Sequence, residues 1–184
     1  MDNQTKSSHD RLLFLTCFIA IVTTAFGFIV RAIVLPEWGV EFNLTQTQLG
    51  EISGVGLWPF AISIVLFSLV VDKIGYKTSL GFAFICHVTS VGLTVTADGY
   101  STLYLATFIG AIGNGIVEAV ANPVVATMFA KEKTKWLSIL HAGWPGGLVL
   151  GAILGVLMGT DVAWPYNIAL SLLPPIMYGD MLLR

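Results

Sequence analysis

The stretch Gly27-Phe-Ile-Val-Arg31-Ala-Ile-Val-Leu-Pro36 aligns with Asn114-Gly-Ile-Val-Glu118-Ala-Val-Ala-Asn122-Pro123, which begins 87 residues later in the chain. At a spacing of 86 residues, Leu57-Trp58-Pro59 aligns with Gly143-Trp144-Pro145. Similarity that recurs at nearly one spacing is the sequence signature of an internal repeat. We therefore expect two related units, with Arg31 and Glu118 at equivalent positions in them.

The composition places both units in a lipid bilayer. Of the 184 residues, 55% are apolar and only 11% are charged; the mean hydropathy is +0.82 and the formal net charge is -2. A soluble domain carries about 25% charged residues, so this chain cannot cover itself with a wetted surface. The composition therefore excludes a nucleic-acid-binding protein and a secreted scaffold.

Six apolar runs are long enough to cross a membrane, since a helical span needs about 20 apolar residues. They cover residues 12–35, 50–71, 78–97, 101–129, 136–159 and 164–183. Each unit then holds three spans, and an odd number orients the two units oppositely across the membrane, as in many secondary transporters. The sequence thus predicts an all-α membrane protein with six transmembrane helices arranged as two inverted three-helix repeats. We assign a cytoplasmic N-terminal tail to residues 1–11, the first repeat to 12–97 and the second to 98–184.

The basic residues outside the spans all fall on one side of this topology. They are Lys6, Arg11, Lys73, Lys77, Lys131, Lys133, Lys135 and Arg184. The opposite loops contain Glu37, Glu41, Asp98 and Asp161 and no Lys or Arg. Cytoplasmic loops carry the excess of Lys and Arg, so we expect both termini in the cytoplasm, with the protein in a bacterial inner membrane. Asn43-Leu-Thr45 is formally a glycosylation sequon, but Thr45 is better explained as the cap of the second helix.

Two full charges, Arg31 and Glu118, lie well inside the predicted spans. A charged side chain at the bilayer centre costs about 2.5 to 3.5 kcal/mol even on the mildest scale, so each should face a cavity or a partner. The two side chains can form a buried pair, Arg31 can reach the outer headgroups, or each can face a cavity. The sequence leaves these alternatives open.

A polar stripe surrounds the glutamate, because Asn114, Glu118 and Asn122 recur at every fourth residue of an apolar helix. Such a stripe lines either a helix contact or a water-filled cavity. Intramembrane carboxyl groups commonly take part in proton relays, so Glu118 is the predicted proton-binding residue.

The fifth span combines a glycine ladder with two side chains that can bind a solute. Glycine recurs at every fourth position, at Gly143, Gly147, Gly151, Gly155 and Gly159, which predicts close packing against another helix. His141 and Trp144, like Trp58 in the first repeat, can stack on a sugar ring or donate hydrogen bonds to hydroxyls, although packing roles are equally compatible with their positions. His87 is interpreted as a satisfied interior histidine.

No metal, cofactor or catalytic residue is predicted. Cys17 and Cys86 lie inside apolar runs without Cys or His at metal-ligand spacing, and we interpret both as small core residues. An intramembrane enzyme is disfavoured because no second catalytic group stands at fixed helical spacing from Glu118.

The loop Ser68-Leu-Val-Val-Asp72-Lys73-Ile-Gly75-Tyr76-Lys77 resembles the signature of the major facilitator superfamily, with Asp72, Lys73, Gly75 and Lys77 in the expected places and Ser68 in place of the first glycine. Physically, Gly75 permits a tight turn, and Asp72 can accept hydrogen bonds from a helix N-terminus that break when the two halves rock apart. The resemblance implies that these four residues form a gating loop.

Within that superfamily, Glu118-Ala-Val-Ala-Asn122-Pro123 resembles the fourth helix of the fucose permease group, where the equivalent glutamate takes part in proton-coupled sugar uptake. The first-helix aspartate of that group falls near Ala32 here, beside Arg31, so coupling through that pair is not implied. A family member has twelve spans. The resemblance therefore makes this chain an N-terminal six-helix half without its C-terminal half, either a fragment or a half-transporter that dimerises.

The expected function is secondary active transport of a small polar organic solute, a sugar or related compound, by alternating access, with protons as the candidate coupling ion. The predicted solute and proton site comprises Arg31, Trp58, Asn114, Glu118, Asn122, His141 and Trp144. The expected partners are the solute, protons, the lipid bilayer, and a C-terminal half or a second copy. The alternative is a non-transporting membrane sensor or assembly subunit that has the same fold.

Overall fold

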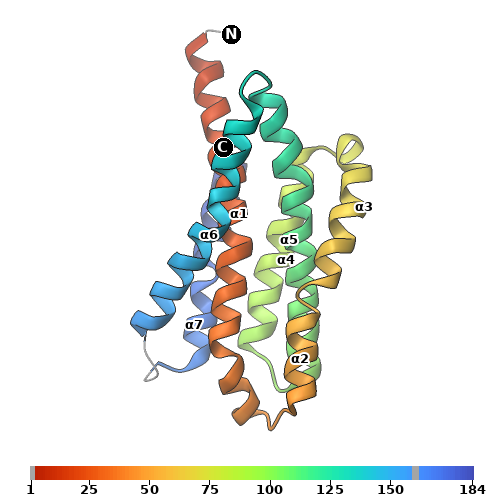
Figure 1. Cartoon of the computed structure of the whole chain (residues 1–184), viewed down its shortest axis with the longest axis vertical. Helices are drawn as coiled ribbons and strands as arrows, with labels where there is room; N and C mark the ends of the chain where they lie inside the picture. Colours follow the sequence, from red (N-terminus) through yellow and green to blue (C-terminus); the bar gives the residue numbers. More distant parts are fainter. Residues whose placement is uncertain (1–2, 159–161) are drawn as a thin grey trace.

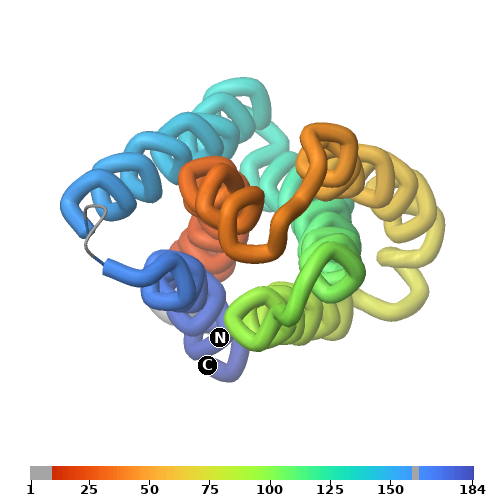
Figure 2. Tube along the Cα trace, turned by 90° about the horizontal axis from the view of Figure 1, so that it is seen from below, coloured from red at the N-terminus to blue at the C-terminus, as the bar shows by residue number. Residues whose placement is uncertain are grey.

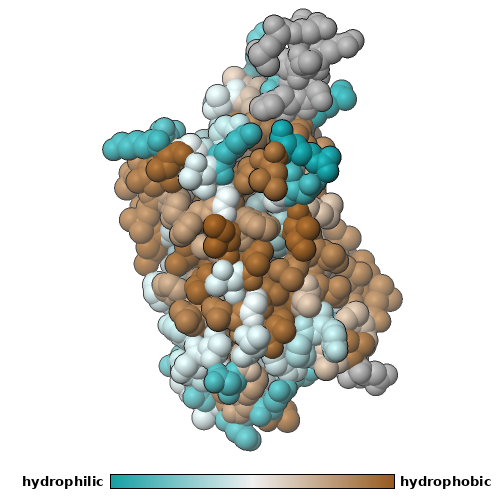
Figure 3. All heavy atoms as spheres, turned by 180° about the vertical axis from the view of Figure 1, so that it is seen from behind, coloured by the Kyte–Doolittle hydropathy of each residue, from teal (hydrophilic) through white to brown (hydrophobic). Residues whose placement is uncertain are grey.

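The computed structural model describes residues 3–158 and 162–184, and in this part of the chain it contains α-helices and no strand (Figure 1). Five of the predicted spans are long and apolar enough to cross a membrane. Apolar side chains form a broad band between two more polar ends on the face shown in Figure 3. The predicted all-α membrane fold is therefore confirmed. The helices are α1 (Asn3–Glu41), α2 (Gln46–Gly54), α3 (Trp58–Ile74), α4 (Tyr76–Val95), α5 (Tyr100–Met128), α6 (Lys133–Met158), α7 (Trp164–Leu170) and α8 (Leu173–Leu183).

Two of the predicted spans are each divided into two helices, where we expected continuous ones. The second span breaks between α2 and α3, and the sixth between α7 and α8. Pro59 lies in the first turn of α3, and Pro174 and Pro175 lie in the first turn of α8. A proline is tolerated there because its missing N–H would have no intrahelical partner, whereas inside a helix it removes a hydrogen bond. The prolines therefore start new helices.

The helices pack in the pairs that an inverted repeat requires. α1 runs along α6 while α5 runs along α3, and α5 packs on α4 while α1 packs on α8 and α7 (Figure 2). If spans one to three are exchanged with spans four to six, the contact of α1 with α6 corresponds to that of α5 with α3. The contact of α5 with α4 then corresponds to that of α1 with α7 and α8. This correspondence is expected for two repeats related by a pseudo-two-fold axis. The division of the chain at residues 97 and 98 stays a prediction.

The glycine ladder of α6 packs closely against another helix, as predicted, and the structure identifies that helix as α1. A Cβ atom on Gly151 would lie 2.5 Å from Cγ2 of Ile29, and one on Gly155 would lie 2.8 Å from Cδ1 of Ile33. Only glycine lets the two backbones approach this closely. Gly159, the last rung of the predicted ladder, lies outside the described residues.

Both described ends of the chain lie at one end of the bundle, together with the α3–α4 and α5–α6 connections (Figure 1). The α3–α4 turn is made at Gly75, which has φ +81°, a region that favours glycine. At the opposite end Thr45 caps α2, as predicted. Its hydroxyl oxygen accepts from the Gln48 backbone N–H at 3.2 Å, and its own N–H donates to Gln48 Oε1 at 2.9 Å.

Candidate transport site

The polar stripe of α5 divides into two parts with different surroundings. Asn114 is turned toward α4 and lines a small cavity between α1, α4, α5 and the broken sixth span. Glu118 and Asn122 lie one and two turns further along α5 and bond to each other. The sequence predicted the stripe but not this division.

Asn114 belongs to a hydrogen-bonded chain that joins three helices. Nε2 of His87 lies 3.0 Å from Oδ1 of Asn114, and Nδ1 of His87 lies 3.0 Å from the Tyr178 hydroxyl of α8. Because the Asn114 oxygen can only accept, Nε2 is the donor of the first bond, which leaves Nδ1 to accept from Tyr178. His87 is buried with both ring nitrogens bonded, so its interpretation as a satisfied interior histidine is confirmed.

Glu118 and Asn122 form a local pair on α5. The Asn122 side-chain amide donates to Oε2 of Glu118 and to the Glu118 backbone oxygen, each at 3.0 Å. The Asn122 side-chain oxygen is buried and has no hydrogen-bond partner. Glu118 itself is only partly buried, so this titratable group at membrane depth is not sealed inside the bundle.

Arg31 of α1 lies between two cavities. One is the small cavity that Asn114 also lines; the other has a volume of about 190 Å³ and lies between α1, the α2–α3 break and Thr107 of α5. The guanidinium donates one long hydrogen bond, from Nη2 to the Ser90 hydroxyl at 3.4 Å, and its buried Nε has no partner.

Arg31 and Glu118 do not form a salt bridge. The ion pairs among the described side chains are Lys135 with Glu132 and Arg184 with Asp180, and all four of these residues are exposed. Of the alternatives that the sequence left open, the buried pair is therefore excluded in this conformation. Arg31 and Glu118 have different hydrogen-bond partners, Ser90 and Asn122.

The aromatic side chains predicted for the site lie on the surface of this half. Trp58 at the start of α3 is 49% exposed and packs edge-on against Phe108. Trp144 of α6 is 38% exposed and lies beside Phe28 of α1. His141, one turn before Trp144, is also exposed. α6 continues as a helix through Pro145.

The four residues of the predicted gating loop flank the α3–α4 turn. Asp72 and Lys73 end α3, Gly75 forms the turn and Lys77 begins α4, and all four are exposed. No hydrogen bond of the Asp72 carboxylate occurs among the described side chains. The turn geometry therefore agrees with the predicted role of Gly75, whereas a contact of Asp72 to a helix N-terminus stays a prediction.

Comparison with known proteins identifies the family. The model of the Major Facilitator Superfamily matches residues 15–178. The chain belongs to this superfamily. Its helices superimpose on a crystal structure of a D-xylose–proton symporter with a TM-score of 0.73 at 15% identity, covering 95% of this chain and 47% of the symporter.

Two curated relatives of this chain have names that refer to very different compounds. An ascorbate transporter of Arabidopsis thaliana chloroplasts is 23% identical over 84% of this chain and 29% of its own length. A class E tetracycline resistance protein of Escherichia coli is 28% identical over 84% of this chain and 39% of its own length. The chain thus spans less than half the length of each relative and matches one half of the superfamily fold.

Sequence reasoning missed two polar residues in and beside the hydrogen-bonded contacts of the predicted site. Ser90 accepts from Arg31, and Tyr178 bonds His87. Ser90 lies one turn after His87 on α4, but neither residue was assigned to the site from the sequence. Their chain separations from these partners, 59 and 91 residues, leave no local signal.

Proposed function

We propose that this chain forms one half of a secondary active transporter that moves a small polar organic solute by alternating access. The observation that carries the proposal is the Glu118–Asn122 pair on a membrane-spanning helix, a titratable group that is neither sealed in the core nor neutralised by Arg31. An intramembrane carboxyl group in such a position is costly and is a functional-site candidate by default. The proposed activity is transport and not catalysis.

Within this proposal, Glu118 binds the coupling proton, and Arg31, Trp58, Asn114, Asn122, His141 and Trp144 face the solute or support the residues that do. A sugar is the solute class we propose first. The exposed indoles of Trp58 and Trp144 are suited to stacking on a sugar ring, and the Glu118–Pro123 segment resembles the fucose permease group. A C-terminal half or a second copy of the chain completes the cavity, and the loop at Asp72, Lys73, Gly75 and Lys77 gates it.

The test is uptake of labelled pentoses and hexoses by cells that express the complete gene product, with and without an inward proton gradient. We expect at least one sugar to accumulate when the gradient is present and only to equilibrate when a protonophore removes it. Cells carrying an empty vector serve as the control. If the protein reaches the membrane and moves none of the sugars, sugar transport is excluded, and organic acids and amines become the next panel.

A further inference from the structure

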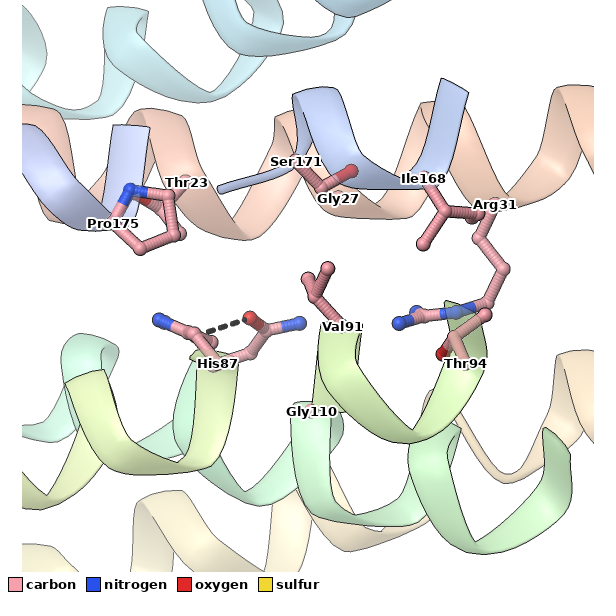
Figure 4. Close-up of a pocket in the computed structure, with 11 residues that line it drawn as sticks. Thr23, Gly27, Arg31, His87, Val91, Thr94, Gly110, Ile168, Ser171 and Pro175 are labelled. Carbon is pink, nitrogen blue, oxygen red and sulfur yellow. Dashed lines mark hydrogen bonds between the residues drawn. The ribbon is translucent and has the colours of Figure 1, made fainter. Parts of the chain in front are cut away.

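The small cavity beside Arg31 has the properties of a ligand site. Its volume is about 30 Å³, and a buried water needs about 10–15 Å³ of such space, so one or two small groups fit. Figure 4 shows the Arg31 side chain leaving α1 and running to the turn of α4 that carries Val91 and Thr94, with His87 at the other end of the cavity.

Among the residues that the structure describes, no carboxylate forms an ion pair with Arg31. Arg31 offers five N–H donors, yet the structure gives it one hydrogen bond, a long one to Ser90, and leaves its buried Nε without a partner. The described residues that line the cavity include no carboxylate. Arg31 is partly buried and its Nε is fully buried. A charge withdrawn from water is normally paired, because an unpaired charge there is strongly destabilising.

Among the described residues, no polar group around the cavity other than Ser90 accepts a hydrogen bond from Arg31. The side-chain oxygen of Asn114 accepts a hydrogen bond from His87. The side-chain NH2 group of Asn114 therefore remains as a second available donor. Thr23 and Thr94 bond backbone carbonyls of their own helices, and Ser90 donates to the Ala106 carbonyl at 2.7 Å. The cavity therefore combines a full positive charge with an amide donor, and none of its described lining residues carries a negative charge.

The backbone around the cavity also departs from a continuous helix. Ser171, at the break between α7 and α8, lines it, and the break between α2 and α3 lines the neighbouring cavity that Arg31 also reaches. Irregular backbone at membrane depth is tolerated where it is buried in protein or lines a water-filled cavity. Each of the two helix breaks therefore lines one of the two cavities beside the Arg31 guanidinium.

We propose that this cavity binds a small anion, held by the Arg31 guanidinium and the Asn114 amide. The volume fits a monatomic ion such as chloride or a single carboxylate group. The anion neutralises the Arg31 charge and links α1 to α5, so its binding stabilises the folded half. This site is separate from the Glu118–Asn122 pair, and it assigns Arg31 and Asn114, two residues that the proposed function places at or beside the solute, to holding the anion.

The experiment measures thermal unfolding of the purified full protein in detergent, in sodium chloride, sodium formate and sodium gluconate at equal ionic strength. Gluconate is too large for the cavity and sets the baseline. We expect a saturable rise of several degrees in the midpoint with chloride or formate, because a ligand that binds only the folded state stabilises it. A rise with chloride alone assigns an inorganic ion, and a rise with formate alone assigns the carboxylate of an organic molecule.

Two variants and one control locate the effect. Arg31→Gln removes the cation, and Asn114→Asp supplies a carboxylate inside the cavity while keeping an acceptor for His87, so both should abolish the anion-dependent rise. Lys133→Gln removes an exposed charge outside the proposed sites and should keep it. Equal midpoints in all three salts would mean that water alone fills the cavity, and a rise that survives in Arg31→Gln would place the anion elsewhere; either result overturns the proposal.

Discussion

A Cβ atom added to Gly147 of α6 would lie 2.6 Å from the backbone carbonyl oxygen of Val22 in α1. The obstacle is main chain, which cannot rotate aside as a side chain can, so Gly147→Ala must push the two helices apart. We expect this variant to lower the midpoint of thermal unfolding in detergent by several degrees.

The neighbouring glycine provides a matched control for this prediction. A Cβ atom on Gly146 would meet no atom within 4 Å. Alanine is favoured over glycine inside a helix by about 1 kcal/mol, so Gly146→Ala should leave the midpoint unchanged or raise it. Similar effects of the two substitutions would show that the α1–α6 contact does not depend on close backbone approach.

A second prediction concerns the hydroxyl of Tyr178. This side chain is fully buried, and its hydroxyl is the partner of Nδ1 in His87. Tyr178→Phe leaves that nitrogen buried without a donor, which costs about 1–3 kcal/mol. The free energy of unfolding in a denaturant series measures the loss. Tyr166→Phe, at a residue that is 66% exposed, is the control and should change it little.

The sequence predicted the spans and the α6 ladder well because both are local patterns. Span length follows from apolar runs, and glycine at every fourth residue of one helix indicates a packing face without knowledge of the partner. The breaks at Leu57 and Leu172 were missed, because the residues around them are as apolar as the spans. Glycine and proline mark them in the sequence, with Gly54, Gly56 and Pro59 at the first break and Pro174 and Pro175 at the second.

The site was predictable only as far as it lies on one helix. Asn114, Glu118 and Asn122 share a face of α5 and were identified from their spacing. The surroundings of Asn114 and Glu118 differ because His87 of α4 forms a hydrogen bond with Asn114 and not with Glu118. Helical spacing cannot show which neighbouring helix covers which turn, so the sequence could place the stripe but not divide it.

A third prediction concerns orientation in the membrane. The end of the bundle that carries Lys73 and Lys131 should face the cytoplasm, because positively charged loops are retained there. A phosphatase reporter, which is active only outside the cytoplasm, should be active when fused after Asp98. The same reporter fused after Lys131 should be inactive. The reverse pair of activities would invert the topology proposed here.

The fourth prediction tests Glu118 as the proton-binding residue. Glu118→Gln keeps the shape of the side chain and an oxygen that can accept the hydrogen bond from Asn122, which is 3.0 Å long in the native pair. The variant cannot bind and release a proton. It should therefore exchange labelled for unlabelled solute across a membrane at a near-native rate but no longer accumulate solute against a gradient.

Glu132→Gln is the control for that measurement, because Glu132 is an exposed glutamate outside the spans whose ion pair with Lys135 contributes little to stability. It should retain both exchange and accumulation. Alanine at position 118 would be a poorer test, since it also leaves a void beside Asn122. If Glu118→Gln accumulates solute with the native dependence on pH, the proton binds elsewhere, and His141, the exposed titratable group of α6, becomes the next residue to substitute.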